Sequence, residues 1–225
     1  MSEIFIIAGP PGIGKSTRGA DFVDPDLDIL NEDDVKVKYK EKGFPDYNEY
    51  AMTRVRNIIR HKLISNEDFA LELNLGFAHQ YEYALSAKKF SRENKLNIIL
   101  FYTDSLQLCL DRAKERYNSG LHLVKPEIIQ QMYFNTIPLL KENFASIDLV
   151  ILIDAGKDNK IVTVAIYNKD LRRLDIHDNS PGWFKNDLKS FIENYLAELK
   201  IEQPGTKPWE SDPDQDQDYR PRRKR

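Results

Sequence analysis

The sequence G-P-P-G-I-G-K-S at residues 9–16 constrains the fold of this 225-residue chain more than any other feature. It fits the phosphate-binding pattern G-x-x-x-x-G-K-[ST] and follows an apolar run at residues 4–8, which is typical of a buried parallel strand. Glycines let the backbone turn so that N–H groups point at phosphate oxygens. We also expect a helix from about residue 15, with its positive N-terminal end facing the anion.

The loop predicts a nucleoside triphosphate site with assigned roles for its side chains. Lys15 is expected to reach the β- and γ-phosphates, and the Ser16 hydroxyl is expected to ligate Mg²⁺. The predicted nucleotide-binding residues are Gly9, Pro10, Pro11, Gly12, Ile13, Gly14, Lys15, Ser16 and Thr17.

Composition excludes several other classes of protein. Hydrophobic residues make up 41% and charged residues 31% of the chain, which is typical of a soluble globular protein. The net charge of -3 gives no basis for a whole-surface nucleic-acid or membrane footprint. The one cysteine, Cys109, excludes an internal disulfide and is expected to be buried packing. The acidic start of the chain shows no targeting segment, so we expect a cytoplasmic protein.

Strand-like and helix-like runs alternate along residues 1–155. This alternation predicts an α/β fold of three layers, with a parallel sheet covered on both faces and ligand at the carboxyl ends of its strands. Besides residues 4–8, the expected strands are 27–30, 69–73, 96–102 and 149–153. Besides the helix from residue 15, the expected helices are 47–63, 77–85, 105–118 and 126–140.

The pattern changes after residue 155. Two β-rich runs at 160–167 and 172–177 predict a hairpin, and apolar residues at helical spacing predict an amphipathic helix over 183–199. We expect one P-loop domain over residues 1–202, with a core at 1–155 and the hairpin and helix at 156–202.

The last segment, residues 203–225, is rich in Pro, Asp and Gln and ends R-P-R-R-K-R. This composition predicts a disordered tail. Its basic end is the one place where nucleic acid could bind, although a solvated tail is the favoured interpretation.

Absent signatures narrow the class of nucleotide-binding protein. The N-K-x-D segment of GTPases does not occur, and N-S-G-L at residues 118–121 is not the transporter signature. A helicase or large ATPase core would need a longer chain, whereas a small-molecule kinase fits the length. Kinase catalysis consists mostly of positioning and electrostatic stabilisation, so we expect carboxylates near the acceptor and metal, and arginines near the transferred phosphate.

Asp33 is the candidate general base, because a carboxylate beside the acceptor hydroxyl can orient it and take its proton. The alternative is that Asp33 or Asp34 caps the next helix, and Asp28 is the fallback base. Glu72 ends a strand expected beside the phosphate loop, where it could bind metal-bound water or a substrate hydroxyl. Asp104 and Asp154 also end strands and are the alternates for the metal.

Arg112 and Arg116 lie four residues apart, so one helix face presents both. Their planar guanidinium groups could neutralise charge on the transferring phosphate. The alternative is a solvated helix face that also carries Asp111, Lys114 and Glu115.

Three further blocks follow the loop in order. The first reads N-E-D-D-V at residues 31–35, and the second reads F-A-L-E-L-N at 69–74. The third reads R-A-K-E-R at 112–116 and continues through Ser119, Gly120, His122, Val124 and Ile128. In this order and spacing the chain resembles the zeta-toxin-like P-loop kinases across roughly residues 3–155.

The resemblance implies an ATP- and Mg²⁺-dependent kinase with Asp33, Arg112 and Arg116 as catalytic residues beside Lys15. It also implies that Glu72, Asn74 and His122 bind the acceptor. The best-known members phosphorylate a UDP-activated amino sugar and act as toxins held by an antitoxin partner. Two departures fall on the acceptor side: Leu73-Asn74 replaces a threonine pair, and Leu121 separates Gly120 from His122.

The leading hypothesis is therefore a kinase for a hydroxyl of a small molecule, such as a UDP-amino sugar. The alternative enzyme is a nucleoside or polynucleotide kinase. The contrasting class is a catalytically silent ATP-binding protein that acts through a partner, which the altered Leu73-Asn74 segment motivates.

Overall fold

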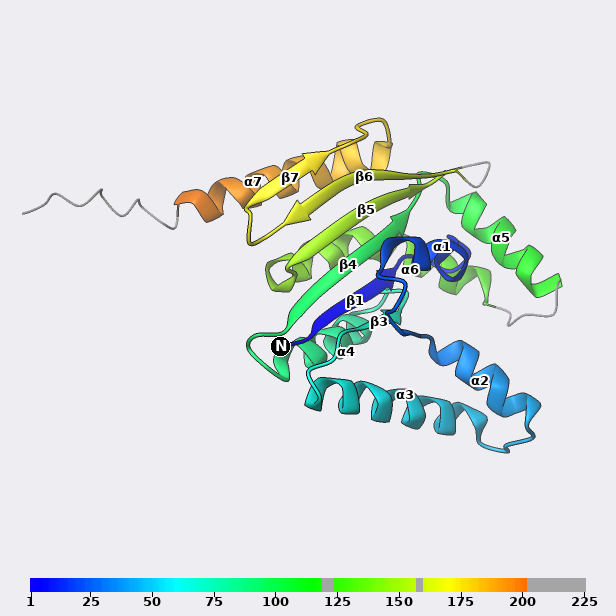
Figure 1. The fold of residues 1–225 in the computed structure, drawn as a ribbon. Coiled ribbons are helices and arrows are strands. Elements are labelled where there is room, and N and C mark those ends of the chain that lie inside the picture. The colour runs from blue at the N-terminus through cyan, green and yellow to red at the C-terminus, as the bar shows by residue number, and fades with distance from the viewer. Residues whose placement is uncertain (119–123, 157–159, 202–225) are drawn as a thin grey trace, which may run out of the picture.

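A sheet with the strand order β2-β3-β1-β4-β5-β6-β7 forms the centre of the computed structural model, which describes residues 1–118, 124–156 and 160–201 (Figure 1). The strands are β1 (Glu3–Ala8), β2 (Ile29–Leu30), β3 (Phe69–Glu72), β4 (Lys95–Tyr102), β5 (Leu149–Ala155), β6 (Ile161–Asn168) and β7 (Arg173–Ile176). Strands β1 to β5 are parallel, and β1 lies between β3 and β4. The predicted parallel sheet is confirmed, and its carboxyl ends meet at the phosphate loop.

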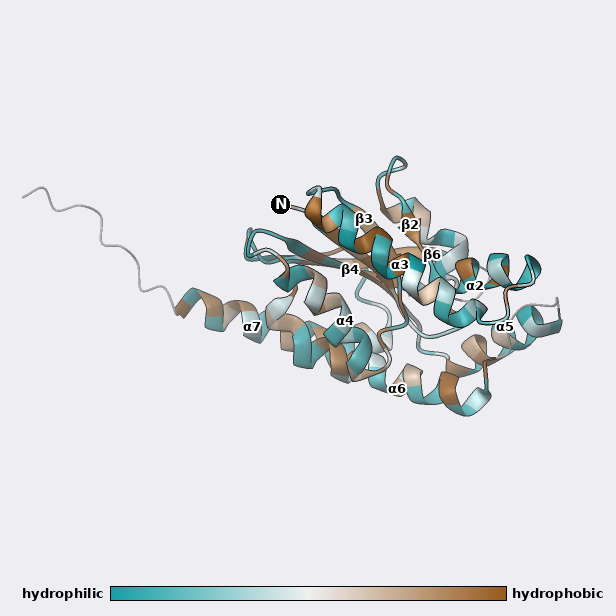
Figure 2. Ribbon diagram, turned by 90° about the horizontal axis from the view of Figure 1, so that it is seen from below, coloured by the Kyte–Doolittle hydropathy of each residue, from teal (hydrophilic) through white to brown (hydrophobic). Residues whose placement is uncertain are grey.

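Helices cover the sheet on both faces. They are α1 (Lys15–Arg18), η1 (Gly19–Phe22), α2 (Glu32–Glu41), α3 (Tyr47–Ile64), α4 (Ala78–Lys89), α5 (Leu106–Asn118), α6 (Pro126–Asn143), η2 (Phe144–Ser146), η4 (Phe184–Leu188) and α7 (Lys189–Ile201). Helices α4, α6 and α7 lie behind the sheet in Figure 1, whereas α1 lies in front of β1. Figure 2 shows hydrophilic and apolar residues side by side on the helices, as expected where one helix face packs on the sheet. None of the described helices is long and apolar enough to cross a membrane.

The buried core follows the apolar runs of the sequence. The strands β1 and β4 are buried along nearly their whole length, because helical layers cover both of their faces. Cys109 is completely buried, as expected for a packing residue, and burial raises the pKa of its thiol to about 11.

The predicted hairpin extends the same sheet. Strand β6 pairs antiparallel with β5, and β7 pairs antiparallel with β6. Behind them, Phe144 and Tyr167 pack at a ring distance of 4.6 Å, and Tyr195 of α7 contacts both rings. The expected helix at 183–199 is therefore present as η4 and α7. The predicted disordered tail at 203–225 lies outside the described residues.

The prediction of a helix from about residue 15 is confirmed, because α1 begins at Lys15. It is a single turn, followed by η1 from Gly19, where a Cβ atom would lie 2.8 Å from the Ile7 side chain. Such a short helix offers little dipole to a phosphate, so the loop itself must supply the donors. The strand expected at 27–30 shrinks to Ile29–Leu30.

Helix α2 was not predicted from the sequence. None of its residues is buried, so it has no apolar stripe for periodicity to reveal. Contacts at its N-terminal end stabilise α2 instead. The Asn31 side chain accepts a hydrogen bond from the Asp33 backbone N–H at 2.9 Å, and Lys36 pairs with Glu32 at 2.9 Å one turn apart. Helix α2 therefore places Asp33 in its first turn.

Candidate functional site

The phosphate loop connects β1 to α1 and has a backbone that requires glycine at two close approaches. Gly9 has φ +135°, and a Cβ atom there would lie 2.2 Å from the Phe101 carbonyl oxygen. Gly12 has φ +81°, and its Cβ would lie 2.3 Å from the Cys109 carbonyl oxygen. Neither position accepts a side chain without moving β4 or α5. The loop is therefore wedged against two neighbouring elements, which fixes where its N–H groups lie.

Lys15 is buried in this loop and hydrogen-bonded at its end. Its Nζ donates to the carbonyl oxygens of Gly9 at 2.8 Å and Pro10 at 3.1 Å, and to Oδ1 of Asn74 at 2.8 Å. Burial lowers the pKa of the amine from 10.5 to about 8, and the Glu72 carboxylate opposes that effect. A buried cation held only by neutral oxygens is well suited to bind an anion.

Ser16 and Glu72 meet beside the lysine. The Ser16 hydroxyl donates to Oε1 of Glu72 at 2.8 Å. Glu72 reaches this face because it pairs in register with Ile7, against which Gly19 packs. The phosphate loop and the second sequence block thus come together through Lys15–Asn74 and Ser16–Glu72 contacts.

A cavity of about 690 Å³ opens in front of the loop. Arg112 and Arg116 both line it from α5, as the four-residue spacing predicted. Arg112 donates to the carbonyl oxygens of Ile13 at 3.4 Å and Gly156 at 3.2 Å, so it links the loop to the end of β5. Arg116 makes no hydrogen bond or ion pair with any residue that the structure describes. Its charge helps to lower the pKa of Lys15, which is consistent with its place in the same cavity.

Asp33 lies at the start of α2 with 74% of its side chain exposed. Lys36 donates to its Oδ1 at 3.1 Å, and Asp33 does not line the cavity. Its negative charge nevertheless acts on Lys15, where it raises the pKa. The helix cap is Asn31 rather than Asp33, so the capping alternative was wrong for this carboxylate. The fallback, Asp28, pairs with Lys62 at 3.0 Å.

The two alternate metal carboxylates hold the C-terminal segment instead. Asp104 accepts hydrogen bonds from the backbone N–H groups of Gly182 and Trp183, both at 2.7 Å. Asp154 accepts from the Trp183 indole at 2.9 Å, and burial raises the pKa of this carboxyl. Both oxygens of Asp104 and Oδ1 of Asp154 are therefore engaged, and Glu72 is the strand-end carboxylate that faces Ser16.

Some site residues were missed by sequence reasoning. Ala155, Lys160 and Ile161 line the cavity from the turn between β5 and β6, and Glu115 and Arg18 complete its rim. No sequence motif marks these residues. They line the cavity because β6 pairs antiparallel with β5 and so brings the start of β6 next to the end of β5. The predicted acceptor residue His122 lies within residues 119–123, which are outside the described residues.

A parallel sheet with a phosphate loop after its central strand defines an α/β P-loop NTPase fold. The search of family models found no match for this chain, and no curated protein matched its sequence. Solved structures do match. The AvrRxo1-ORF1:AvrRxo1-ORF2 complex with sulphate ions aligns at a TM-score of 0.62 and 12% identity, covering 83% of this chain and 63% of that chain.

Two further structures give the same fold. The AvrRxo1-ORF1:-ORF2 complex with ATP aligns at a TM-score of 0.61 and 13% identity, again over 83% of this chain and 63% of that one. The PezAT chromosomal toxin–antitoxin system of Streptococcus pneumoniae aligns at 0.54 and 14% identity, over 89% and 84%. This chain thus spans about 63% of the AvrRxo1-ORF1:-ORF2 chain that it matches. The resemblance to zeta-toxin-like P-loop kinases is confirmed at the level of the fold.

Proposed function

We propose that this protein is an ATP- and Mg²⁺-dependent kinase that transfers the γ-phosphate to a hydroxyl of a small molecule. One observation carries the proposal: a buried lysine, a serine–carboxylate pair and two arginines surround a single cavity at the end of the parallel sheet. This is the set of groups that phosphoryl transfer needs for positioning and charge stabilisation. The neighbour solved with ATP has the same fold and supports ATP as the donor.

The donor nucleotide is proposed to lie along the cavity. Its phosphates would accept hydrogen bonds from the loop N–H groups and from Lys15, which exchanges its neutral oxygen partners for phosphate oxygens. The apolar side chains of Ala155 and Ile161 offer a surface for the base at the other side of the cavity. Arg112 would hold the loop and the β5 end together around the nucleotide.

The residues present fit Mg²⁺. The Ser16 hydroxyl and the Glu72 carboxylate are hard oxygen donors 2.8 Å apart, and Mg²⁺ usually adds substrate phosphates and water to one or two protein ligands. Among the described residues no group of three or more His, Cys, Asp or Glu side chains could hold a metal, in keeping with a site completed by the nucleotide. When bound, the ion would neutralise charge on the phosphates.

On the acceptor side, Asp33 is proposed to accept the proton of the attacking hydroxyl, and Arg116 to stabilise charge on the transferred group. Glu72, Asn74 and His122 are proposed to bind the acceptor, with Glu72 shared with the metal. A UDP-amino sugar is the acceptor that the family resemblance favours. The protein is further proposed to act in the cytoplasm as a toxin with an antitoxin partner, since AvrRxo1-ORF1 and PezAT were both solved as two-component systems.

A transfer assay tests the proposal. Labelled phosphate from γ-labelled ATP is followed into a panel of UDP-amino sugars, nucleosides and oligonucleotide ends, with Lys15→Ala as the inactive control. Label in a sugar that is absent with Lys15→Ala supports the proposal. Label only in nucleosides or oligonucleotides would move the acceptor to the alternative kinase class.

A catalytically silent ATP-binding protein is the second candidate, because Asn74 stands where the family has threonine and takes the lysine as its partner. It predicts ATP binding by calorimetry with no labelled product in any tube. For the toxin proposal, the wild type should arrest growth on expression, whereas Lys15→Ala should not. Equal growth of the two strains would reject a toxin role while leaving the kinase proposal standing.

A further inference from the structure

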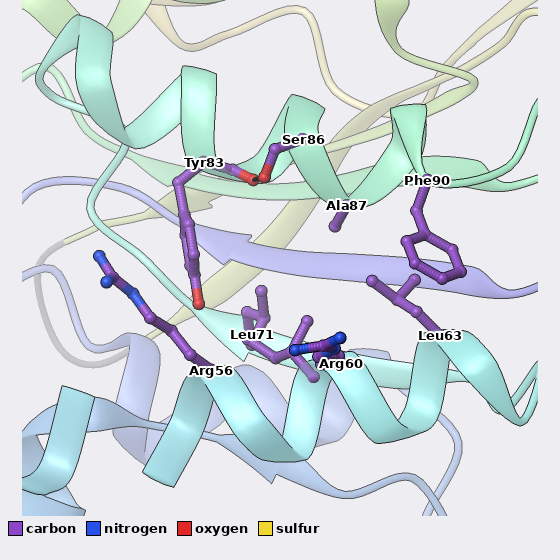
Figure 3. A pocket seen from close by; sticks show the side chains of 9 residues that line it. Arg56, Arg60, Leu63, Leu71, Tyr83, Ser86, Ala87 and Phe90 are labelled. Carbon is purple, nitrogen blue, oxygen red and sulfur yellow. Dashed lines mark hydrogen bonds between the residues drawn. The ribbon is translucent and has the colours of Figure 1, made fainter. Parts of the chain in front are cut away.

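A second cavity lies between α3 and α4, with the end of β3 as its floor (Figure 3). Its volume is about 310 Å³, which is within the usual range for small-molecule sites. It shares no lining residue with the nucleotide cavity. The floor residue Leu71 points away from the face on which Glu72 meets Ser16, because successive residues of a strand face opposite sides. The two cavities therefore lie on opposite faces of the sheet.

Polar groups line one part of the cavity, and apolar side chains line its far end. In Figure 3 Arg56 lies at one end, and the hydroxyl end of Tyr83 lies between it and Arg60, which is beside Leu71 in the middle of the cavity. Leu63, Ala87 and Phe90 gather at the opposite end, as the same view shows. Leu71 and Ile59 are buried and form the apolar floor between the two ends.

The two arginines are available to a ligand. Arg56 and Arg60 lie one helical turn apart on α3, so the same helix face presents both. Neither guanidinium has a hydrogen bond or ion pair to a residue in the described ranges. This contrasts with Lys62 on the same helix, which pairs with Asp28 and Glu67.

Tyr83 adds a donor between the cations and the apolar floor. Its hydroxyl has no hydrogen-bond partner within the part of the chain that the structure describes. Burial raises the pKa of this phenol, with Arg56 opposing the effect, so the group stays protonated at neutral pH. The two guanidinium groups offer only donors, and the hydroxyl can donate as well, which suits a carboxylate, sulfonate or phosphate.

The apolar end favours a ring or short chain. Phe90 is 53% exposed at the end of α4 and faces Leu63 across the cavity. Burying this surface would add a hydrophobic contribution to the charge-assisted hydrogen bonds at the other end. A ligand that carries both an anionic head and an apolar body satisfies both ends at once.

We propose that the α3–α4 cavity binds a small amphipathic anion, an aryl or medium-chain acyl group with one acidic head. The head contacts the Tyr83 hydroxyl, with Arg56 on one side of it and Arg60 on the other, and the apolar body lies over Leu71 towards Phe90. The size of the cavity fits such a molecule rather than a folded protein. The site is independent of the proposed kinase activity, because the two cavities share no residue.

The test uses 8-anilinonaphthalene-1-sulfonate as a fluorescent probe on the full chain, with saturating Mg²⁺-ATP present to occupy the other cavity. We expect saturable binding of one probe molecule. Octanoate should displace it, whereas octylammonium, which has the same chain and the opposite charge, should not. Probe binding that ATP abolishes, displacement by octylammonium, or no saturable binding would each overturn the proposal.

Variants locate the site. Replacing both arginines, Arg56→Gln with Arg60→Gln, should weaken binding at least about tenfold, since hydrogen bonds to charged groups are removed. Arg54→Gln is the control for each single variant, Arg56→Gln or Arg60→Gln, because it also removes one positive charge from α3 but at a residue that lines a different groove. Ser86→Trp should block the cavity from α4 while all arginines remain. Thermal melts and ATP binding check that each variant folds. Unchanged probe affinity in the folded double variant or in Ser86→Trp would reject the site.

Discussion

The proposed donor side and the proposed acceptor side of the candidate site are built differently. On the donor side, Lys15 has three oxygen partners and Ser16 is bonded to Glu72. On the proposed acceptor side, Arg116 has no hydrogen bond or ion pair within the described residues, and Asp33, which lies outside the cavity lining, is 74% exposed. The donor side is thus organised before any ligand arrives, whereas the acceptor side has polar groups that water solvates until a substrate replaces it. Substitutions on the two sides should therefore fail in different ways.

The largest effect is expected from Lys15→Met. The substitution keeps the buried chain but removes the charge that faces the phosphates, so phosphoryl transfer should fall by about 10³-fold. The fold should survive, because the loop is held by Gly9 and Gly12 against β4 and α5. Steady-state transfer and a thermal melt measure the two properties. Lys160→Met, at an exposed position of the same cavity, is the control and should reduce transfer far less. Near-normal transfer by Lys15→Met would mean that the Lys15 charge is not needed for phosphoryl transfer.

Asp33→Asn should lower kcat by about 10²-fold, because the amide cannot take the proton of the acceptor hydroxyl. The affinity for ATP should stay within about twofold, since Asp33 makes no contact with the loop. Calorimetry with a non-hydrolysable ATP analogue and a transfer assay separate the two quantities. Asp34→Asn removes the same charge one residue along α2 and is the matched control. If both variants lose kcat equally, the effect is one of general charge, and Asp33 is not the base.

Arg112 and Arg116 test this difference directly, because we assign Arg112 to the donor side and Arg116 to the acceptor side. Arg112 binds two backbone oxygens around the loop, so Arg112→Gln should weaken ATP binding about tenfold. Arg116 has no such role, so Arg116→Gln should lower kcat by a similar factor while ATP affinity stays the same. Lys114→Gln, on the same helix, is the control for lost charge. A loss of ATP affinity in Arg116→Gln with kcat unchanged would place both arginines on the donor side.

The same contrast explains what the sequence could predict. The loop, the parallel strands and the helix that carries Arg112 and Arg116 follow from local patterns of glycine and apolar residues. Helix α2 has no buried face, so no periodicity reveals it, and the position of Asp33 depends on the Asn31 cap. Ala155 and Ile161 enter the cavity only because β6 reverses direction beside β5. Pairing between β5 and β6 sets the place of Ala155 and Ile161, and it leaves no local signature.

Asp104 and Asp154 show that a local pattern can also suggest residues that the structure uses for another purpose. Both end strands at the edge where ligands bind in such folds, and the residue pattern alone makes them equal to Glu72 as candidates. Trp183, about 30 residues beyond β5, distinguishes these two residues from Glu72, because it donates a hydrogen bond to each of their carboxylates. A distant C-terminal helix therefore changes the role of two strand-end residues that a local motif would have called functional.

A pH dependence should follow from the protonation of Lys15, whose pKa is about 8 because the amine is buried. Phosphate binds the charged ammonium form, so the affinity for ATP should be constant below about pH 7. It should fall as the pH rises through 8, approaching tenfold per pH unit, since each unit then removes tenfold of the charged form. Calorimetry with a non-hydrolysable analogue from pH 6 to 9.5 measures the profile. Lys15→Met should give a flat profile at lower affinity.

Asn74 tests the cause of that profile. Its Oδ1 is one of three oxygens that bind the ammonium group, so Asn74→Ala should shift the midpoint of the pH profile down. Asn74→Asp places a negative charge at the same distance and should shift the midpoint up, by the same logic that makes Glu72 raise the pKa of Lys15. Opposite shifts from two substitutions at one residue cannot come from a general loss of structure. A midpoint that both variants leave in place would mean that Asn74 does not set the state of Lys15. Asn74, which stands where the zeta-toxin-like pattern has a threonine, would then act only in the proposed binding of the acceptor.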